Sequence, residues 1–111
     1  EDIARAVKLG VDALGFVFYA PSSRSVAPAH AAMLTSSVPA FVTRVGLFVN
    51  EKPAIIQNIF ERTRLNLIQY HGDETPEFCD AVGLPFMKAF RVRPGIDIQT
   101  EMERYPNASG F

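Results

Sequence analysis

Three polar residues, Gln69, His71 and Asp73, stand at alternate positions at the end of an apolar run. In an extended strand the side chains alternate between faces, so Gln69 and His71 share one face and Tyr70 points to the other. An amide and an imidazole on one face can bind a polar ligand together, and Gly72 lets the chain turn sharply over them. The alternative is that His71 only caps the strand end. In either case both polar groups need hydrogen-bond partners.

Arg24 lies in a serine-rich loop that follows another apolar run. A guanidinium group in such a loop can hold a carboxylate through two parallel hydrogen bonds. The alternative is an arginine that only meets solvent. Taken alone, the residues around the loop favour the solvated arginine over the ligand-binding one.

Three further side chains carry reactive or charged groups. Asn50 precedes the helix-start Pro53, where bonding to the loop backbone is favoured over ligand contact. Lys88 is a charge inside an apolar strand, and it either reaches the ligand end of that strand or snorkels to an edge. Cys79 falls in a helix without a nearby base, so we expect a core residue rather than a nucleophile.

The histidines and the cysteine are too widely spaced for a metal site, and the sequence holds no glycine-rich nucleotide motif.

A scaffold of strands must bring these side chains together. Short apolar runs predict strands at 12–18, 44–49, 65–70 and 85–90, and residues 109–111 resemble the start of another. Helical spacing and helix-start prolines predict helices at 3–9, 28–37, 53–60, 75–82 and 96–105. This alternation indicates parallel α/β units, in either an open doubly wound sheet or a (β/α)8 barrel. Both architectures bind ligands at the carboxyl ends of their strands.

The composition is that of an ordinary globular domain, with 48% hydrophobic and 21% charged residues. A net charge of −1 offers no basic field for nucleic acid or an anionic membrane. The single cysteine favours a reducing compartment, and no apolar run is long enough to span a bilayer. We therefore expect one cytoplasmic domain over residues 1–111, whose partner is a small molecule or another protein chain.

Five stretches of the sequence resemble phosphoribosylanthranilate isomerases, the (β/α)8 barrels of tryptophan biosynthesis. These stretches keep the family order and spacing over essentially the whole chain: 13–19, 22–26, 44–50, 69–73 and 87–90. Tyr70 departs from the leucine usual in the family, on the side of its strand that faces away from the site. The resemblance implies a TIM barrel, of which this chain is a central fragment from helix 1 to the start of strand 6.

The resemblance also implies an activity, the Amadori rearrangement of N-(5′-phosphoribosyl)anthranilate to the 1-deoxyribulose-5-phosphate product, without any cofactor. In the family an aspartic acid protonates the ribose ring oxygen, and a cysteine thiolate then removes a proton from the adjacent carbon. The matching positions would lie before Glu1 for the cysteine and just beyond Phe111 for the aspartic acid. We therefore expect no catalytic residue within this chain, and no activity from residues 1–111 alone.

For substrate binding, the resemblance implies three residues. Arg24 matches the family arginine that holds the anthranilate part, while His71 and Gln69 match polar groups that line the pocket. Cys79 does not match the catalytic cysteine. Two alternatives stay open: a non-catalytic half barrel whose unpaired strand edges give a homodimer, and a related ribulose-phosphate barrel such as indoleglycerol-phosphate synthase. The strings at 48–50 and 69–72 argue against the second alternative.

Overall fold

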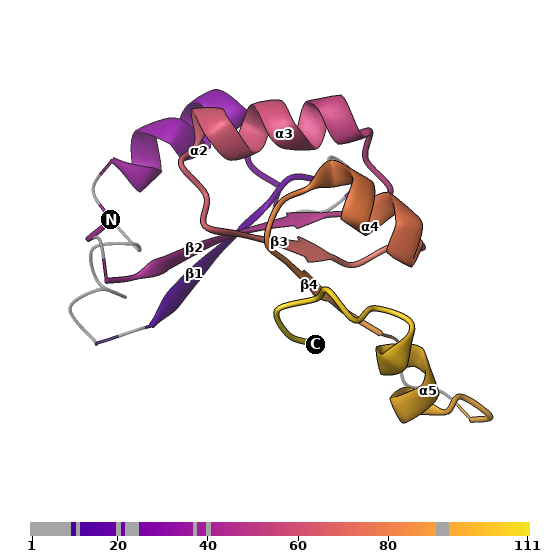
Figure 1. The fold of residues 1–111 in the computed structure, drawn as a ribbon. Helices are drawn as coiled ribbons and strands as arrows, with labels where there is room; N and C mark the ends of the chain where they lie inside the picture. The colour runs from indigo at the N-terminus through magenta and orange to yellow at the C-terminus, as the bar shows by residue number, and fades with distance from the viewer. Residues whose placement is uncertain are drawn as a thin grey trace.

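The computed structural model describes residues 10, 12–19, 21, 25–36, 38–39, 41–90 and 94–111. Strands and helices alternate along this part of the chain (Figure 1), in the order β1 (Ala13–Val17), α2 (Pro28–Thr35), β2 (Thr43–Phe48), α3 (Pro53–Arg62), β3 (Leu67–Tyr70), α4 (Pro76–Val82), β4 (Phe86–Lys88) and α5 (Ile98–Glu103). Each is an element that the sequence predicts, with bounds that differ by at most two residues at either end. The helix predicted at 3–9 lies outside the described residues.

The described strands form one parallel sheet in the order β1-β2-β3-β4. Next to β4, Gly110 makes a parallel bridge with Met87, and the backbone N–H of Lys88 donates to the Gly110 carbonyl oxygen at 3.2 Å. Residues near 109–111 therefore do begin to pair at the next position of the sheet, as the sequence predicts. A doubly wound sheet reverses its strand order. Among the described strands there is no such reversal.

Helices α2, α3 and α4 cover the same face of the sheet (Figure 1). Strand side chains alternate between this buried face and the opposite one, as the pleat requires. The buried face joins the strand residues Phe16, Phe48, Ile68, Tyr70 and Phe86 to the helix residues Ala31, Ile56, Ile59, Cys79 and Val82. The opposite face is half-buried and carries Val17, Val45, Leu47, Leu67, Gln69 and Met87.

Local sequence explains where the helices begin and end. Proline opens α2, α3 and α4, where its missing N–H costs no helical hydrogen bond. At the start of α4 the Thr75 hydroxyl oxygen accepts a hydrogen bond from the Phe78 backbone N–H at 3.1 Å. Gly83 ends this helix with a φ of 74°, a left-handed conformation that glycine adopts without strain.

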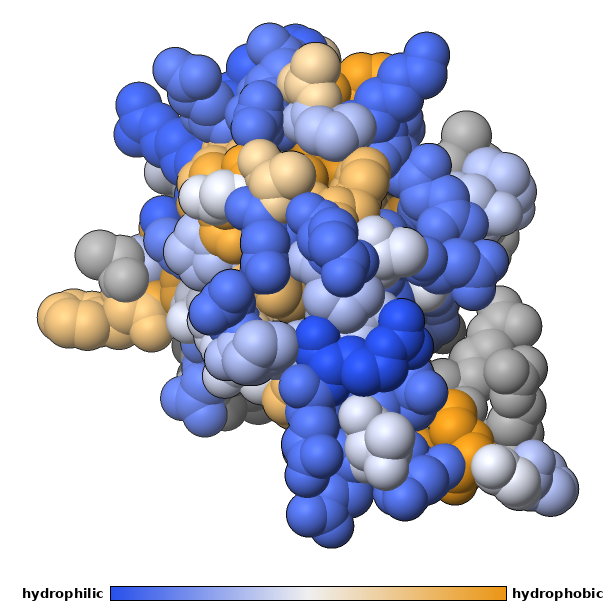
Figure 2. Space-filling model, turned by 45° about the vertical axis from the view of Figure 1, so that its right-hand side comes forward, coloured by the Kyte–Doolittle hydropathy of each residue, from blue (hydrophilic) through white to orange (hydrophobic). Residues whose placement is uncertain are grey.

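The last helix, α5, lies beyond the carboxyl end of β4 rather than over the sheet (Figure 1). It has six residues and buries none of them. The molecule's surface around α5, at the bottom of Figure 2, is mostly hydrophilic. No helix in the described ranges is long and apolar enough to cross a membrane.

Candidate active site

A cavity of about 470 Å³ opens at the carboxyl ends of the strands. It is lined by residues at or just after the ends of the four described strands and by residues in and beside α5: Tyr19, Val49, Asn50, His71, Gly72, Asp73, Thr75, Lys88, Ala89, Phe90, Ile96, Glu101, Arg104 and Tyr105. This is the edge of a parallel α/β sheet at which ligands bind. The cavity offers imidazole, amide, carboxylate and guanidinium groups to a polar ligand.

His71 is the predicted site residue that the structure brings to this cavity. Its backbone N–H donates to the Phe48 carbonyl oxygen at 3.0 Å, which extends the pairing of β3 with β2 by one residue. The imidazole of His71 is exposed. His71 therefore stands on a fixed backbone with a side chain that a ligand can reach.

Gln69 lies two residues earlier, on the half-buried face of the sheet between Leu47 and Met87. It does not line the cavity that holds His71. Tyr70, between them, is fully buried beneath the helices, so the predicted alternation of faces along β3 is confirmed. Arg24 lies outside the described residues, and the structure does not place it.

Asn50 bonds loop backbone, but in the loop that follows β3 rather than in its own loop before Pro53, where the sequence predicts the bond. Its side-chain Oδ1 accepts a hydrogen bond from the backbone N–H of Asp73 at 2.8 Å. Asn50 has a φ of 50°, a left-handed conformation that asparagine tolerates better than most residues. A Cβ on Gly72 would lie 2.6 Å from Asn50 Oδ1, so a larger residue at this point would push the Asn50 side chain away from the Asp73 N–H.

Glu74 was not predicted as a site residue, and it is the partner that Lys88 needs. Lys88 is 3% exposed and its Nζ lies 3.1 Å from Glu74 Oε1. The suggestion that Lys88 snorkels to an edge is therefore wrong: its ammonium turns to the carboxyl ends of the strands and is buried there. A buried lysine demands a carboxylate, but nothing in the spacing identifies Glu74 as that carboxylate.

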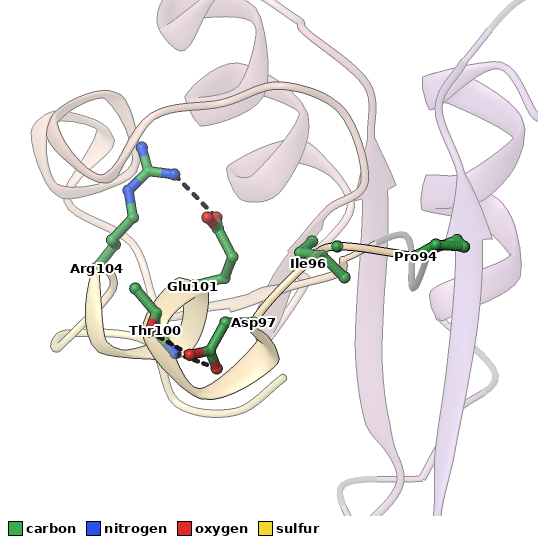
Figure 3. Close-up of a pocket in the computed structure, with 7 residues that line it drawn as sticks. Pro94, Ile96, Asp97, Thr100, Glu101 and Arg104 are labelled. Atoms are coloured by element: carbon green, nitrogen blue, oxygen red, sulfur yellow. Dashed lines mark hydrogen bonds and ion pairs between the residues drawn. The ribbon is translucent and has the colours of Figure 1, made fainter.

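A second hollow, of about 420 Å³, lies beside α5 and shares Ile96, Glu101 and Arg104 with the first. Figure 3 shows Asp97 turned toward Thr100 at the start of the helix and Arg104 turned toward Glu101. The hydroxyl and backbone N–H of Thr100 donate to the Asp97 carboxylate at 2.8 and 3.3 Å, and these bonds hold the pKa of Asp97 below its ordinary value. The polar groups of Asp97 and Thr100 thus bond each other at the start of the helix and are not free to bind a ligand.

A protein-family model, N-(5′-phosphoribosyl)anthranilate (PRA) isomerase, matches residues 1–111, the whole chain. The chain belongs to the PRA isomerase family. The N-(5′-phosphoribosyl)anthranilate isomerase of Dechloromonas aromatica (strain RCB) is 46% identical over 111 residues, which are 100% of this chain and 53% of that protein. The chain thus spans about half the length of the curated PRA isomerases it matches.

Solved PRA isomerases share the fold described above. A crystal structure of monomers generated from the dimeric enzyme of Thermotoga maritima matches with a TM-score of 0.89 and 33% identity, covering 98% of this chain and 56% of that one. A PRA isomerase in complex with reduced 1-(o-carboxyphenylamino)-1-deoxyribulose 5-phosphate matches with a TM-score of 0.83 and 38% identity, over 93% and 52% of the two chains. The four parallel strands therefore correspond to about half of a PRA isomerase.

Cys79 is the only cysteine of this chain, and it is completely buried in α4. Burial raises the pKa of its thiol to about 11, although the Lys88 ammonium acts in the opposite direction. At neutral pH Cys79 is therefore a protonated core residue, as the sequence predicts. Among the described residues, no three His, Cys, Asp or Glu side chains form a group that could hold a metal ion.

Proposed function

We propose that this chain forms the substrate-binding wall of a PRA isomerase that converts N-(5′-phosphoribosyl)anthranilate to its 1-deoxyribulose-5-phosphate product. The observation that carries the proposal is the polar cavity at the carboxyl ends of four in-order parallel strands, in a chain that matches this family along its whole length. The reaction is an aldose–ketose rearrangement that needs acid and base groups but no cofactor.

The proposed architecture is a single domain over residues 1–111 within a (β/α)8 barrel, from helix 1 to the start of strand 6. Two observations support it. The described strands follow one another in sheet order, and Gly110 begins the next position beside β4. The covering helices α2, α3 and α4 share one face, which leaves the opposite face as the barrel interior.

Within the barrel we assign substrate contacts to Arg24, His71 and Gln69. Arg24 would hold the anthranilate carboxylate by a charge-assisted pair of hydrogen bonds, and His71 already stands at the cavity. Gln69 would reach the ligand from the interior face of β3. The acid that opens the ribose ring and the thiolate that removes the neighbouring proton would come from positions outside residues 1–111.

The proposed setting is the cytoplasm, with a small phosphorylated substrate and self-association to a homodimer. The phosphorylated analogue bound to one PRA isomerase supports the substrate class, and the dimeric enzyme of T. maritima supports the association. An unpaired strand edge and a half-buried apolar sheet face are the surfaces through which such a chain would associate.

The assignment of Arg24 is tested by Arg24→Ala in a full-length PRA isomerase that contains this chain. We expect KM for N-(5′-phosphoribosyl)anthranilate to rise at least about tenfold, because each charge-assisted hydrogen bond contributes about 1.5–3 kcal/mol. Arg62→Ala, an exposed arginine at the end of α3, is the matched control and should leave KM unchanged. If Arg24→Ala leaves KM and kcat unchanged, Arg24 is a solvated loop residue.

A further inference from the structure

One buried carboxylate joins the loops that follow β2 and β3 to the end of β4. Glu74 is 5% exposed. Its Oε2 accepts a hydrogen bond from the Asn50 backbone N–H at 2.7 Å, and its Oε1 accepts one from the Gly72 backbone N–H at 2.9 Å. Lys88 Nζ donates to Glu74 Oε1 at 3.1 Å and to the Gly72 carbonyl oxygen at 2.5 Å. The carboxyl ends of three neighbouring strands are therefore fixed to one ion pair.

Further contacts extend this network to both sides of His71. Asn50 Oδ1 accepts a hydrogen bond from the backbone N–H of Asp73, and Glu74 Oε1 accepts one from the backbone N–H of Gly72. From the segment after α5, the Tyr105 hydroxyl donates to the Glu74 carbonyl oxygen at 2.7 Å. The imidazole of His71 thus projects from a backbone whose next two N–H groups are both taken by side chains. The position of that imidazole therefore depends on the buried Glu74 and on Asn50, which is itself exposed at the cavity.

The ion pair is arranged to hold backbone rather than to exchange protons with a ligand. Both oxygens of Glu74 already accept hydrogen bonds from backbone N–H groups, and the Lys88 charge is balanced beside it. The side chains of Lys88 and Glu74 are 4% and 1% exposed. A charge buried to this extent is stable only while its partners stay in place. Loss of the carboxylate charge should therefore release several loop contacts at once.

We propose that the Glu74–Lys88 pair positions the loops of the site and thereby sets its affinity for substrate. The pair fixes the backbone of Asn50 and Gly72, and through Gly72 it fixes the neighbouring His71. The proposal rests on the proposed function, because it takes the cavity at the strand ends as the substrate site. Glu74 and Lys88 act through the loop backbone. Removing the pair should therefore weaken substrate binding far more than it slows the turnover of bound substrate.

The first test is Glu74→Gln in a full-length PRA isomerase that contains this chain, followed by amide hydrogen exchange. Glutamine keeps the shape of the side chain but loses the charge and one acceptor. We expect the amides of Asn50 and Gly72 to exchange at least about tenfold faster. The Arg44 amide, which Asn66 Oδ1 holds at 2.8 Å elsewhere in the sheet, is the internal control and should not change. Unchanged exchange at Asn50 and Gly72 would overturn the proposal.

The second test is steady-state kinetics of the same variant. We expect KM to rise about tenfold while kcat changes less than about threefold. Glu77→Gln, an exposed glutamate in the first turn of α4, is the charge-matched control. Ile59→Val, a core change in α3, shows whether lost stability alone moves KM. Faster exchange with an unchanged KM would overturn the role in binding.

If Glu74→Gln does not fold, Tyr105→Phe tests the same network with a nearly isosteric change. It removes the hydroxyl that anchors the Glu74 carbonyl oxygen, and we expect KM to rise about threefold with kcat preserved. An unchanged KM for Tyr105→Phe would count against the proposal. If the unmodified protein shows no isomerase turnover, the proposed function fails, whereas the exchange measurement still decides whether the pair positions the loops.

Discussion

At the residue scale, Tyr70 is the least satisfied polar group in the core. Its ring is fully buried, with its centroid 5.5 Å from the ring centroid of Phe86 and 6.0 Å from that of Phe78. Its hydroxyl has no hydrogen-bond partner among the described residues. Burial raises the pKa of the phenol, and nearby Cys79 and Glu74 add to that shift. We predict that Tyr70→Phe raises the free energy of unfolding by about 1 kcal/mol, because an unpaired buried hydroxyl is costly. Urea denaturation measures the change.

Tyr105→Phe is the matched control for this prediction. The Tyr105 hydroxyl is also buried, but it donates to the Glu74 carbonyl oxygen at 2.7 Å. Its removal should lower the free energy of unfolding by about 1 kcal/mol, since a made hydrogen bond is lost. If both phenylalanine variants change stability in the same direction, the interpretation of Tyr70 is wrong.

Cys79 should behave as a core group rather than a reactive one. The native thiol has a pKa of about 11 against an ordinary value of 9.0, so the unfolded chain loses this proton first as the pH rises. The stability that the buried neutral thiol contributes is therefore complete below pH 9 and is lost between pH 9 and 11. We predict that iodoacetamide labels Cys79 at pH 8 only in denaturant, as measured by the mass of the proteolytic peptide that contains Cys79. Rapid labelling of Cys79 in the native protein would contradict this.

Part of the site follows from sequence because local rules decide it. The two-residue repeat of a strand is enough to separate Gln69 and His71 from Tyr70. The partner of Lys88 does not follow, because Glu74 lies in the loop between β3 and α4 and meets Lys88 of β4 only in the folded sheet. Sequence predicts that a lysine in an apolar strand needs a partner, but it does not say which carboxylate serves.

At the element scale, β2 depends on Gly46. A Cβ at this position would lie 2.5 Å from Leu65 Cδ1 and 3.1 Å from the Phe48 ring. Leu65 is 4% exposed and belongs to the buried core, so a shift of its side chain would disturb the packing of its neighbours. We predict that Gly46→Ala lowers the free energy of unfolding by about 1–3 kcal/mol, the usual cost of overpacking a core. Thermal or urea denaturation of the full-length protein tests this.

Gly15→Ala in the neighbouring strand is the control. No described atom lies within 4 Å of a Cβ at Gly15. The change should cost less than about 0.5 kcal/mol, as is usual where no contact is disturbed. An equal loss of stability in the two variants would mean that glycine is needed for the strand backbone rather than for space at position 46.

The elements themselves were largely predictable, since helix starts carry local signals. Proline at the first turn marks α2, α3 and α4, and each begins within one residue of its prediction. For α5 the predicted range 96–105 is longer than the observed Ile98–Glu103. Asp97 caps the helix at its start, and from Tyr105 the chain turns back to Glu74. Pro106, directly after Tyr105, disfavours a helical conformation at Tyr105 and so limits the helix locally. The contact of Tyr105 with Glu74 is tertiary, and local spacing does not reveal it.

At the scale of the whole molecule, we predict that purified residues 1–111 do not catalyse the PRA isomerase reaction. In the proposed mechanism the acid and the thiolate would both come from outside this range, so the chain would supply binding groups only. The measurement is an isomerase assay at high protein concentration, with the full-length enzyme as the positive control. Turnover by the purified chain would show that its own residues supply the acid and the base.

Sequence predicted parallel α/β units but left two architectures open. Strand order separates them, and strand order depends on which edge of the sheet each new strand joins. In the described structure every strand joins the edge formed by its predecessor, and the helices that cover the sheet share one face. Hydrophobic periodicity carries no information on that choice, so the resemblance to a barrel family had to supply it.

The order β1-β2-β3-β4 also bears on how such a chain is made. Each strand pairs with the one synthesised just before it, so the partner edge is present when a new strand leaves the ribosome. Sheet contacts then span one helix and one strand, a shorter separation than in a parallel sheet whose strand order is shuffled. Translation can therefore build this sheet one unit at a time, from its amino-terminal edge toward the carboxyl terminus.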